Sequence, residues 1–345
     1  MLALRPLAVA VFVLASALAK PAALDQARLD GLLKEVGEIT GLAVKRKVPA
    51  RSVTRDEWKQ WVDDEVRRTV KPEEIRADEL ALRLFGLIPR DYDLRKATVD
   101  LLGEQAAAVY DPRRKLMLVV EGASQEGLMA DMVLVHELAH ALADQHFDLK
   151  RFLDKGVKTG EDQTARLAVV EGQAMWVMLE WQMKKMGSSL KGNRAALDMM
   201  LPMMGRLAAE QYPIFSSAPL YLRETLLFPY SAGILFQQAA IEQSPSDAFL
   251  RVLRKPPVST RQIIHPEVWL SGESAPPPEL PQAPKGYKGL TGGTLGELDL
   301  RILLEQFVSQ DDARSLSPEW RAGAYEVLER KQQRGGKDDR ALLRW

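Results

Sequence analysis

Apolar residues recur at helical spacing over most of the chain, and this pattern predicts a mostly helical protein. The clearest example runs from about Gln125 to Phe147, where apolar side chains repeat every three or four residues and therefore share one helix face. The same spacing predicts further helices at residues 24–44, 54–68, 73–85, 162–186, 194–210, 231–243 and 295–308.

One β-hairpin is predicted among these helices. The segments 106–110 and 115–120 are rich in Ala, Val, Leu and Tyr, and the Asp-Pro pair between them favours a turn. Helices, one hairpin and then more helices form an α+β arrangement dominated by helix. A free strand edge along Lys115–Val120 would allow the hairpin to pair with an extended peptide backbone.

The first nineteen residues have the pattern of an export signal. Arg5 is followed by an apolar run from Leu7 to Leu14 and then by small residues that form overlapping A-x-A cleavage sites. The run is too short to favour a stable membrane span, so we expect cleavage near residue 17 or 19 and release into the periplasm or the medium. An uncleaved N-terminal anchor is the alternative.

Composition limits the partners and the kind of metal site. Lys and Arg together number 47, as do Asp and Glu, so the overall charge does not favour nucleic acid or an anionic membrane as a partner. The chain has no cysteine, which excludes disulfides, thiolate metal sites and a lipid-attachment cysteine. A metal site would have to use His, Asp or Glu.

An H-E-x-x-H motif, H-E-L-A-H from His136 to His140, lies inside the clearest predicted helix. At about 3.6 residues per turn both histidines fall on one face and can bind the same ion, while Glu137 can reach a water bound to that ion. Besides His140, the residues three and four positions from His136 are Met132, Val133 and Ala139, all apolar, which indicates that this face is turned inward. Two solvated histidines on a charged helix are the alternative interpretation.

Two residues can supply a third metal ligand, and they imply different families. His146 would complete the metzincin pattern, but Ala143 stands where that pattern has the glycine that turns the chain back. A continuing helix would place His146 about 15 Å along the axis from His136. Glu171 has only apolar residues three and four positions away, so a carboxylate buried there needs a cation. A zinc ion held by His136 and His140 meets that need, and a distant arginine is the alternative.

Several other segments extend the motif into a longer pattern. They are A-A-V-Y-D-P before it, H-E-L-A-H-A-L-A-D-Q-H-F-D-L through it, V-V-E-G-Q-A after it, F-P-Y-S-A-G from residue 228 and P-P-V-S-T-R-Q-I-I-H-P-E from residue 256. Together they resemble a family of exported bacterial zinc metallopeptidases of the gluzincin, or thermolysin-like, clan, over roughly residues 54–307. The resemblance implies a gluzincin-like two-lobed fold and a zinc site of two histidines and a glutamate, which matches Glu171 rather than His146.

The sequence also suggests a division of the chain and a supporting residue. We expect a signal peptide at residues 1–19, a metallopeptidase-like domain at 20–272, a linker or loop with five prolines ending at residue 284, and a helical extension at 285–345. Many gluzincins carry an aspartate four residues after the glutamate ligand, where this chain has Met175. Asp144, one turn after His140, is the predicted outer-shell partner instead.

Peptide hydrolysis also needs a donor for the oxyanion that forms at the attacked carbonyl. Tyr230 follows Pro229 and His265 precedes Pro266, so each candidate donor lies on a segment stiffened by proline. A packing tyrosine and a buried histidine that shapes the turn are the alternatives.

The sequence therefore predicts an exported, zinc-dependent peptidase that acts on peptide or protein substrates. His136, His140 and Glu171 would hold the metal, and Glu137 would act as the general base. The alternatives are a pseudoenzyme that keeps the metal for stability or partner binding, and a helical cell-envelope interaction protein with a fortuitous motif.

Overall fold

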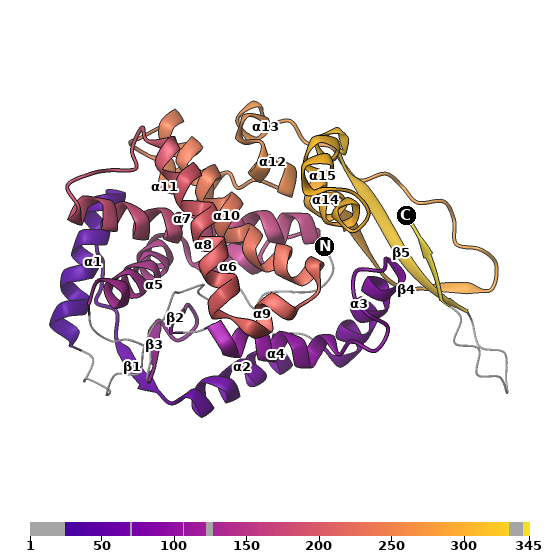
Figure 1. The fold of residues 1–345 in the computed structure, drawn as a ribbon, viewed down its shortest axis with the longest axis horizontal. Helices are drawn as coiled ribbons and strands as arrows, with labels where there is room; N and C mark the ends of the chain where they lie inside the picture. The colour runs from indigo at the N-terminus through magenta and orange to yellow at the C-terminus, as the bar shows by residue number, and fades with distance from the viewer. Residues whose placement is uncertain (1–24, 70, 106, 122–126, 331–340) are drawn as a thin grey trace.

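A computed structural model describes residues 25–69, 71–105, 107–121, 127–330 and 341–345 (Figure 1). The predicted signal peptide at residues 1–19 lies outside the described residues. The described part is α+β and mostly helical, as predicted. Its helices are α1 (Gln26–Thr40), α2 (Arg55–Thr69), α3 (Pro72–Leu84), α4 (Leu94–Gln105), α5 (Leu128–Phe147), α6 (Leu149–Asp154), α7 (Gly160–Lys185), α8 (Arg194–Gln211), α9 (Pro213–Ser217), α10 (Leu220–Gln243), α11 (Ala248–Arg254), α12 (Thr260–Ile264), α13 (Pro266–Ser271), α14 (Glu297–Glu305) and α15 (Gln310–Leu316).

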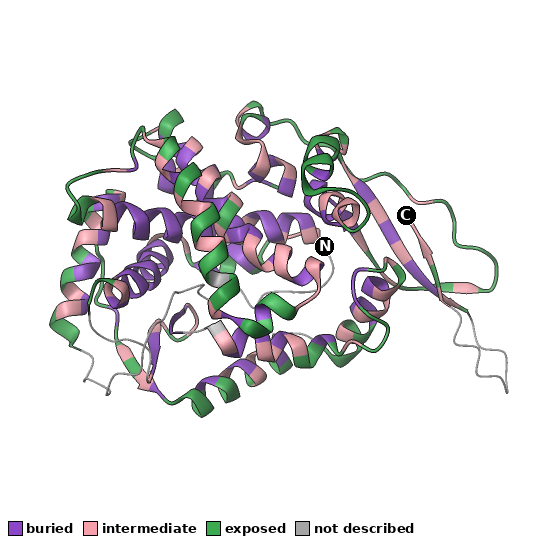
Figure 2. Cartoon of the chain, viewed as in Figure 1, coloured by how far each residue is buried: buried purple, intermediate pink, exposed green. Residues whose placement is uncertain are grey.

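The core consists of three long helices. Helix α7 packs against α5 and against α10, and α1 covers α5 and α7 at one end of the molecule (Figure 1). Every residue of α7 from Ala168 to Trp181 is buried, which is why this helix has no polar stripe (Figure 2). Helix α10 begins well before the predicted start at Ser231 and continues through Pro229. Because proline usually ends a helix, the sequence pattern did not predict the turns of α10 that precede Pro229.

Helices α7 and α10 cross where each carries a glycine. A Cβ atom on Gly172 would overlap the backbone of Gly233, and a Cβ atom on Gly233 would overlap the carbonyl oxygen of Ala168. The two backbones can approach this closely only because neither residue has a side chain. Glu171 directly precedes Gly172, and Tyr230 lies about one turn before Gly233, so the crossing brings their two helix segments together.

The predicted hairpin is confirmed, but its free edge is not where the sequence placed it. Strands β1 (Ala50–Val53), β2 (Ala108–Asp111) and β3 (Leu116–Val120) form a sheet in the order β1-β3-β2. The edge expected at Lys115–Val120 is occupied, because β1 pairs in parallel with β3. Parallel pairing with a four-residue strand far away in the sequence leaves no local pattern, whereas the hairpin does. The edge strand that packs against α5 is β2.

The C-terminal part is not the helical extension predicted for residues 285–345. It contains an antiparallel sheet of β4 (Tyr287–Leu295), β5 (Gly323–Arg330) and β6 (Ala341–Arg344) beside α14 and α15. Glycines in β4 interrupt the alternation that marks a strand, although Tyr325 and Val327 of β5 do alternate with polar residues. The preceding proline-rich segment, residues 273–284, is mostly exposed and has no regular structure.

Thr260 of α12 connects the start of α7 to this C-terminal part, because its hydroxyl oxygen accepts a hydrogen bond of 3.3 Å from the amide of Leu298. Both the amide and the hydroxyl of Thr260 donate to one Glu161 oxygen at 2.8 Å. Burial, together with the nearby negative charge of Asp299, raises the pKa of Glu161 to about 7. Leu298 and Tyr325 belong to the same hydrophobic core as α5 and α7, so the C-terminal sheet is part of one packed body. No helix in the described part of the chain has the length and apolar character needed to cross a bilayer.

The glycine crossing gives the first prediction. Gly172→Ala should lower the free energy of unfolding by about 1–3 kcal/mol or more, because a methyl group has no room between α7 and α10. Gly31→Ala is the matched control, since a Cβ atom there meets nothing within 4 Å, and it should be neutral or stabilising by up to about 1 kcal/mol. Chemical denaturation of both variants tests this, and equal stability of Gly172→Ala and the unsubstituted protein would contradict the close crossing.

Candidate metal centre

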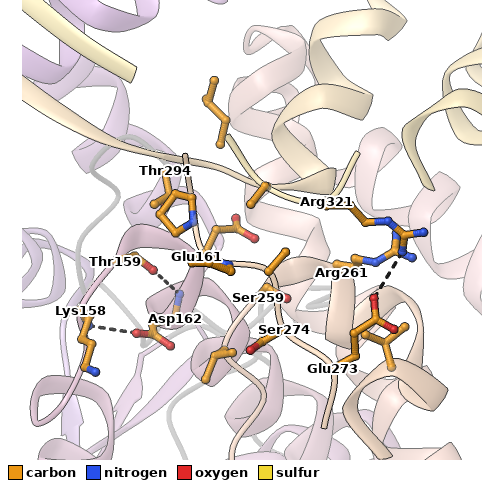
Figure 3. Close-up of a pocket in the computed structure, with 18 of the residues that line it drawn as sticks. Lys158, Thr159, Glu161, Asp162, Ser259, Arg261, Glu273, Ser274, Thr294 and Arg321 are labelled. Atoms are coloured by element: carbon orange, nitrogen blue, oxygen red, sulfur yellow. Dashed lines mark hydrogen bonds and ion pairs between the residues drawn. The ribbon is translucent and has the colours of Figure 1, made fainter. Parts of the chain in front are cut away.

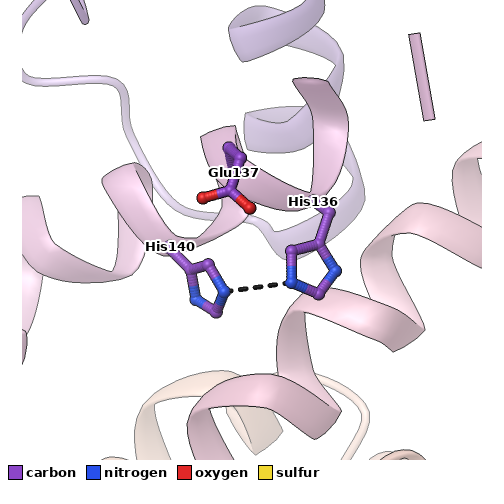
Figure 4. Close-up of side chains that lie close together, drawn as sticks. All are labelled: His136, Glu137 and His140. Atoms are coloured by element: carbon purple, nitrogen blue, oxygen red, sulfur yellow. Dashed lines mark hydrogen bonds between the residues drawn. The ribbon is translucent and has the colours of Figure 1, made fainter. Parts of the chain in front are cut away.

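Helix α5 brings the three polar residues of the motif together inside the core. His136 and Glu137 are fully buried and His140 is 7% exposed. These polar side chains are therefore buried in a part of α5 where most other residues are apolar. One ligand atom from each of the three lies within 4.8 Å of the others (Figure 4). Histidine side chains at positions four apart share a helix face, so the local sequence alone fixes this part of the arrangement.

Glu171 of α7 completes a compact triangle of ligand atoms. His136 Nε2 lies 3.1 Å from His140 Nε2 and 3.3 Å from Glu171 Oε2, and His140 Nε2 lies 3.4 Å from the same oxygen. In a tetrahedral zinc site with bonds of about 2.0–2.1 Å, ligand atoms lie about 3.3 Å apart. The three atoms therefore have the spacing that a single zinc ion requires.

The charges of the triangle fit a cation between its corners. Burial alone would raise the pKa of Glu171, but the charge of His140 and hydrogen bonds from both histidines lower it to about 2. Burial lowers the pKa of His136, whereas in His140 the same effect of burial is outweighed by the Glu171 carboxylate, which raises the pKa. In the described part of the chain no arginine or lysine pairs with Glu171, so the predicted alternative of a distant arginine partner is not what the structure has.

Glu137 is held at the side of this triangle by the backbone of β2. Its Oε2 accepts a hydrogen bond of 2.6 Å from the amide of Tyr110, while its Oε1 is buried and has no partner among the described residues. Burial raises the pKa of Glu137 to about 8. A bound divalent cation would lower that pKa, because it stabilises the carboxylate. One oxygen is thus anchored and the other is left for a proton or a water molecule.

A third carboxylate, that of Asp144, fixes the hairpin to α5, in a role that the sequence did not indicate. The buried Asp144 accepts hydrogen bonds from the Tyr110 hydroxyl and the Lys115 ammonium, each at 2.7 Å, and from the amide of Leu149 at 2.9 Å. None of its bonds reaches His140, so the structure does not give Asp144 the predicted role of outer-shell partner to a histidine. It instead holds Tyr110 where the Tyr110 amide can bind Glu137.

His146 lies outside the cluster. Helix α5 continues through Ala143 to Phe147, as the missing glycine predicts, and His146 Nε2 donates to the carbonyl oxygen of Ala43 at 2.8 Å. The metzincin arrangement would require this side chain to turn back to His136 and His140, and the structure does not bring it there.

The two predicted oxyanion donors have different surroundings. The ring of Tyr230 stacks near that of His136, with 6.4 Å between centroids, and burial together with the nearby Glu171 keeps its pKa well above 10, so the phenol remains a donor. His265 Nε2 instead lies 2.9 Å from the buried Glu297, and its other nitrogen is 3.5 Å from Glu267. The structure therefore brings Tyr230 to the cluster. His265 is instead paired with Glu297 and Glu267, which do not belong to the cluster.

Comparison of the chain with protein-family models, with curated proteins and with solved structures finds no match. The resemblance to exported gluzincins therefore stays a prediction from the motifs. The site residues that sequence reasoning missed are Tyr110, which holds Glu137 through its amide, and Lys115, which pairs with Asp144. The A-A-V-Y-D-P segment was the available signal for Tyr110, but it does not reveal a contact made by the backbone.

The ligand set gives the second prediction. Glu171→Ala should be purified with little zinc, because loss of one ligand from a three-ligand site weakens metal binding by orders of magnitude. His146→Ala is the matched control and should retain about one zinc ion per chain. Elemental analysis of both purified variants decides between the two routes, and the reverse result would replace the glutamate-ligated site by a metzincin-like one.

Proposed function

We propose that the protein is a single-metal, zinc-dependent hydrolase, and specifically a peptidase of the gluzincin type. The observation that carries the proposal is the triangle of His136 Nε2, His140 Nε2 and Glu171 Oε2, with sides of 3.1, 3.3 and 3.4 Å. The buried Glu137 lies beside it, with one oxygen that has no partner among the residues that the structure describes. The gluzincin-like two-lobed fold and export after loss of residues 1–19 are parts of the same proposal, and they rest on the sequence motifs.

The residues around the triangle divide the work of hydrolysis. When bound, zinc would polarise the substrate carbonyl and make a coordinated water acidic enough to lose a proton near neutral pH. Glu137 accepts that proton on its free oxygen and later delivers it to the leaving amine, while the Tyr110 amide keeps the carboxylate in position. Tyr230 donates a hydrogen bond to the developing oxyanion.

A structural or inert metal site fits these observations less well. A structural zinc site is normally closed by a fourth protein ligand and has no use for a base. Here the fourth residue of the cluster, Glu137, is bonded to the Tyr110 amide and keeps one buried oxygen without a partner in the described part of the chain. A helical cell-envelope interaction protein without a metal would have no reason to bury Glu171 between two histidines.

The third prediction tests the base. Glu137→Gln should abolish hydrolysis of an unstructured protein such as casein and leave the zinc content nearly unchanged, because Glu137 acts as a base and is not a ligand. The unsubstituted protein, with and without a zinc chelator, is measured alongside. An active Glu137→Gln protein would rule out the mechanism, and a zinc-free one would make Glu137 a ligand.

The fourth prediction compares the two donors. Tyr230→Phe should slow turnover by roughly 10²-fold while zinc binding is retained, since one oxyanion donor is lost. His265→Ala should slow turnover as much only if its ring leaves Glu297 to reach the substrate. Steady-state rates and zinc contents of both variants separate these cases. A Tyr230→Phe protein with the full rate would show that the phenol is not the donor.

A further inference from the structure

A cavity of about 670 Å³ lies at the start of α7 (Figure 3). Its walls are the residues around the start of α7, the helices α12 and α13, the proline-rich segment, the end of β4 and the residues that precede β5. The cavity is not part of the metal centre, because His136, His140 and Glu171 do not line it. Pockets that bind small molecules commonly measure about 300–1,000 Å³, so the size fits a small organic ligand.

Two contacts hold the proline-rich segment in place as a wall of this cavity. The side-chain amide of Gln262 donates to the carbonyl oxygen of Glu273 at 2.7 Å. The Glu273 carboxylate also lies 3.6 Å from the Arg321 guanidinium (Figure 3). Both side chains of this ion pair are more than half exposed, so the pair contributes little. The wall is therefore fixed mainly by the hydrogen bond from Gln262.

Much of the lining is apolar. It includes Val258 before α12, Val268 of α13, Pro276 and Pro277 of the proline-rich segment, and Leu295 of β4. Val258 is 42% exposed, so part of its apolar surface is left in contact with water. Covering such surface contributes about 25 cal/mol for each Å². The lining therefore favours a ligand with an apolar body.

Two basic side chains of the lining have no acidic partner in the described part of the chain. The Lys158 ammonium is exposed and forms no ion pair there. Arg166 is half-buried, and its contacts are with Phe152, whose carbonyl oxygen accepts from Nη1 at 2.8 Å and whose ring centre lies 5.1 Å from the guanidinium carbon. The Nε atom of Arg166 is buried and has no hydrogen-bond partner among the described residues. This charge is thus partly removed from water without a counter-charge.

Arg166 and Lys158 lie on the same side of the cavity. A Cβ atom on Gly156 would be 3.9 Å from Arg166 Nη2, and Gly156 lines the cavity two residues before Lys158. The other two basic side chains, Arg261 and Arg321, lie on the opposite side from Lys158 (Figure 3).

The basic side chains on that opposite side already have acidic partners. Arg261 Nη1 lies 3.1 Å from the buried Glu297 carboxylate, and Arg321 pairs with Glu273. The positive charge that lacks a partner is therefore found on the side of Lys158 and Arg166.

The two acidic residues near Lys158 are stabilised in other ways. Asp162 accepts a hydrogen bond of 3.0 Å from the amide of Lys158, and Glu161 accepts two from Thr260. Both acids lie in the first turn of α7, where the helix dipole favours negative charge. The raised pKa of Glu161, about 7, also reduces its negative charge near neutral pH. Neither acid forms an ion pair with Arg166, so that guanidinium remains open to an anion from outside the chain.

We propose that this cavity binds a small apolar molecule with one carboxylate, which lies against Arg166 and Lys158 while its apolar body covers Val258 and Leu295. Guanidinium groups form short, strong hydrogen bonds with carboxylates. A medium-chain fatty acid and a short apolar peptide with a free C-terminus share this chemistry. The site is independent of the proposed hydrolase activity, because none of its residues belongs to the metal centre.

The probes are octanoate and N-acetyl-leucyl-leucine, and binding is measured by isothermal titration calorimetry. Each titration is repeated with a zinc chelator, because zinc can also bind a carboxylate. We expect at least one probe to bind with a Kd below about 1 mM under both conditions, and the tighter probe identifies the source of the ligand. The neutral counterparts, 1-octanol and N-acetyl-leucyl-leucinamide, should bind about tenfold or more weakly, since the charge-assisted hydrogen bonds are lost.

Substitutions on the Lys158 side locate the site. Arg166→Gln should weaken binding by about tenfold or more, and Lys158→Gln several-fold, because each removes one of the two charges. Arg206→Gln is the matched control: it changes an exposed arginine of α8 that is not in the lining, and binding should be unchanged. Lys158 is exposed, so its substitution tests the site even if Arg166→Gln fails to fold.

The proposal is wrong if neither carboxylate binds, or if the neutral counterparts bind equally well. It is also wrong if Lys158→Gln and a folded Arg166→Gln protein both bind like the unsubstituted protein. Loss of binding on addition of the chelator would contradict it too, because the carboxylate would then be held at the metal centre and not in the cavity. None of these results would contradict the proposed hydrolase.

Discussion

Glu171 carries a negative charge among apolar neighbours in the buried part of α7, and the arrangement of the three core helices depends on how that charge is compensated. Removing a carboxylate from water costs several kcal/mol unless a cation and hydrogen bonds replace the water. In this protein the compensation comes from His136 and His140, which face Glu171 from α5. The same charge that would destabilise α7 by itself thus holds α7 and α5 in a defined register.

The third helix is brought to the site by the absence of side chains and not by charge. Gly172 and Gly233 let the backbones of α7 and α10 approach closely, and Tyr230 reaches the ring of His136 as a result. Close backbone approach fixes the relative position of two helices more tightly than the packing of flexible side chains. Glu171 and Tyr230, from segments far apart in the sequence, therefore lie next to each other because each is close to a glycine of the crossing.

The position of Glu137 in the site depends on a series of polar contacts through the hairpin. Lys115 and Tyr110 both bond to Asp144, and the Tyr110 amide bonds to Glu137. Hydrogen bonds depend on direction. These contacts together therefore fix the orientation of the Glu137 carboxylate more closely than apolar packing would. The position of the Glu137 carboxylate in the candidate metal centre therefore depends on the register of a small sheet, since a shift of β2 along β3 would remove the Tyr110 amide from Glu137.

The sequence by itself determined the elements whose signals are local. The helix with His136, Glu137 and His140, the hairpin and the inward-facing Glu171 follow from spacing and from the cost of burying an unpaired charge. Only the tertiary structure decided which strand of the hairpin has the free edge, what Asp144 binds, and that β4 forms a sheet with β5 and β6. These features arise from contacts between residues distant in the chain, and a helical or alternating pattern carries no information about a partner that lies beyond the segment itself.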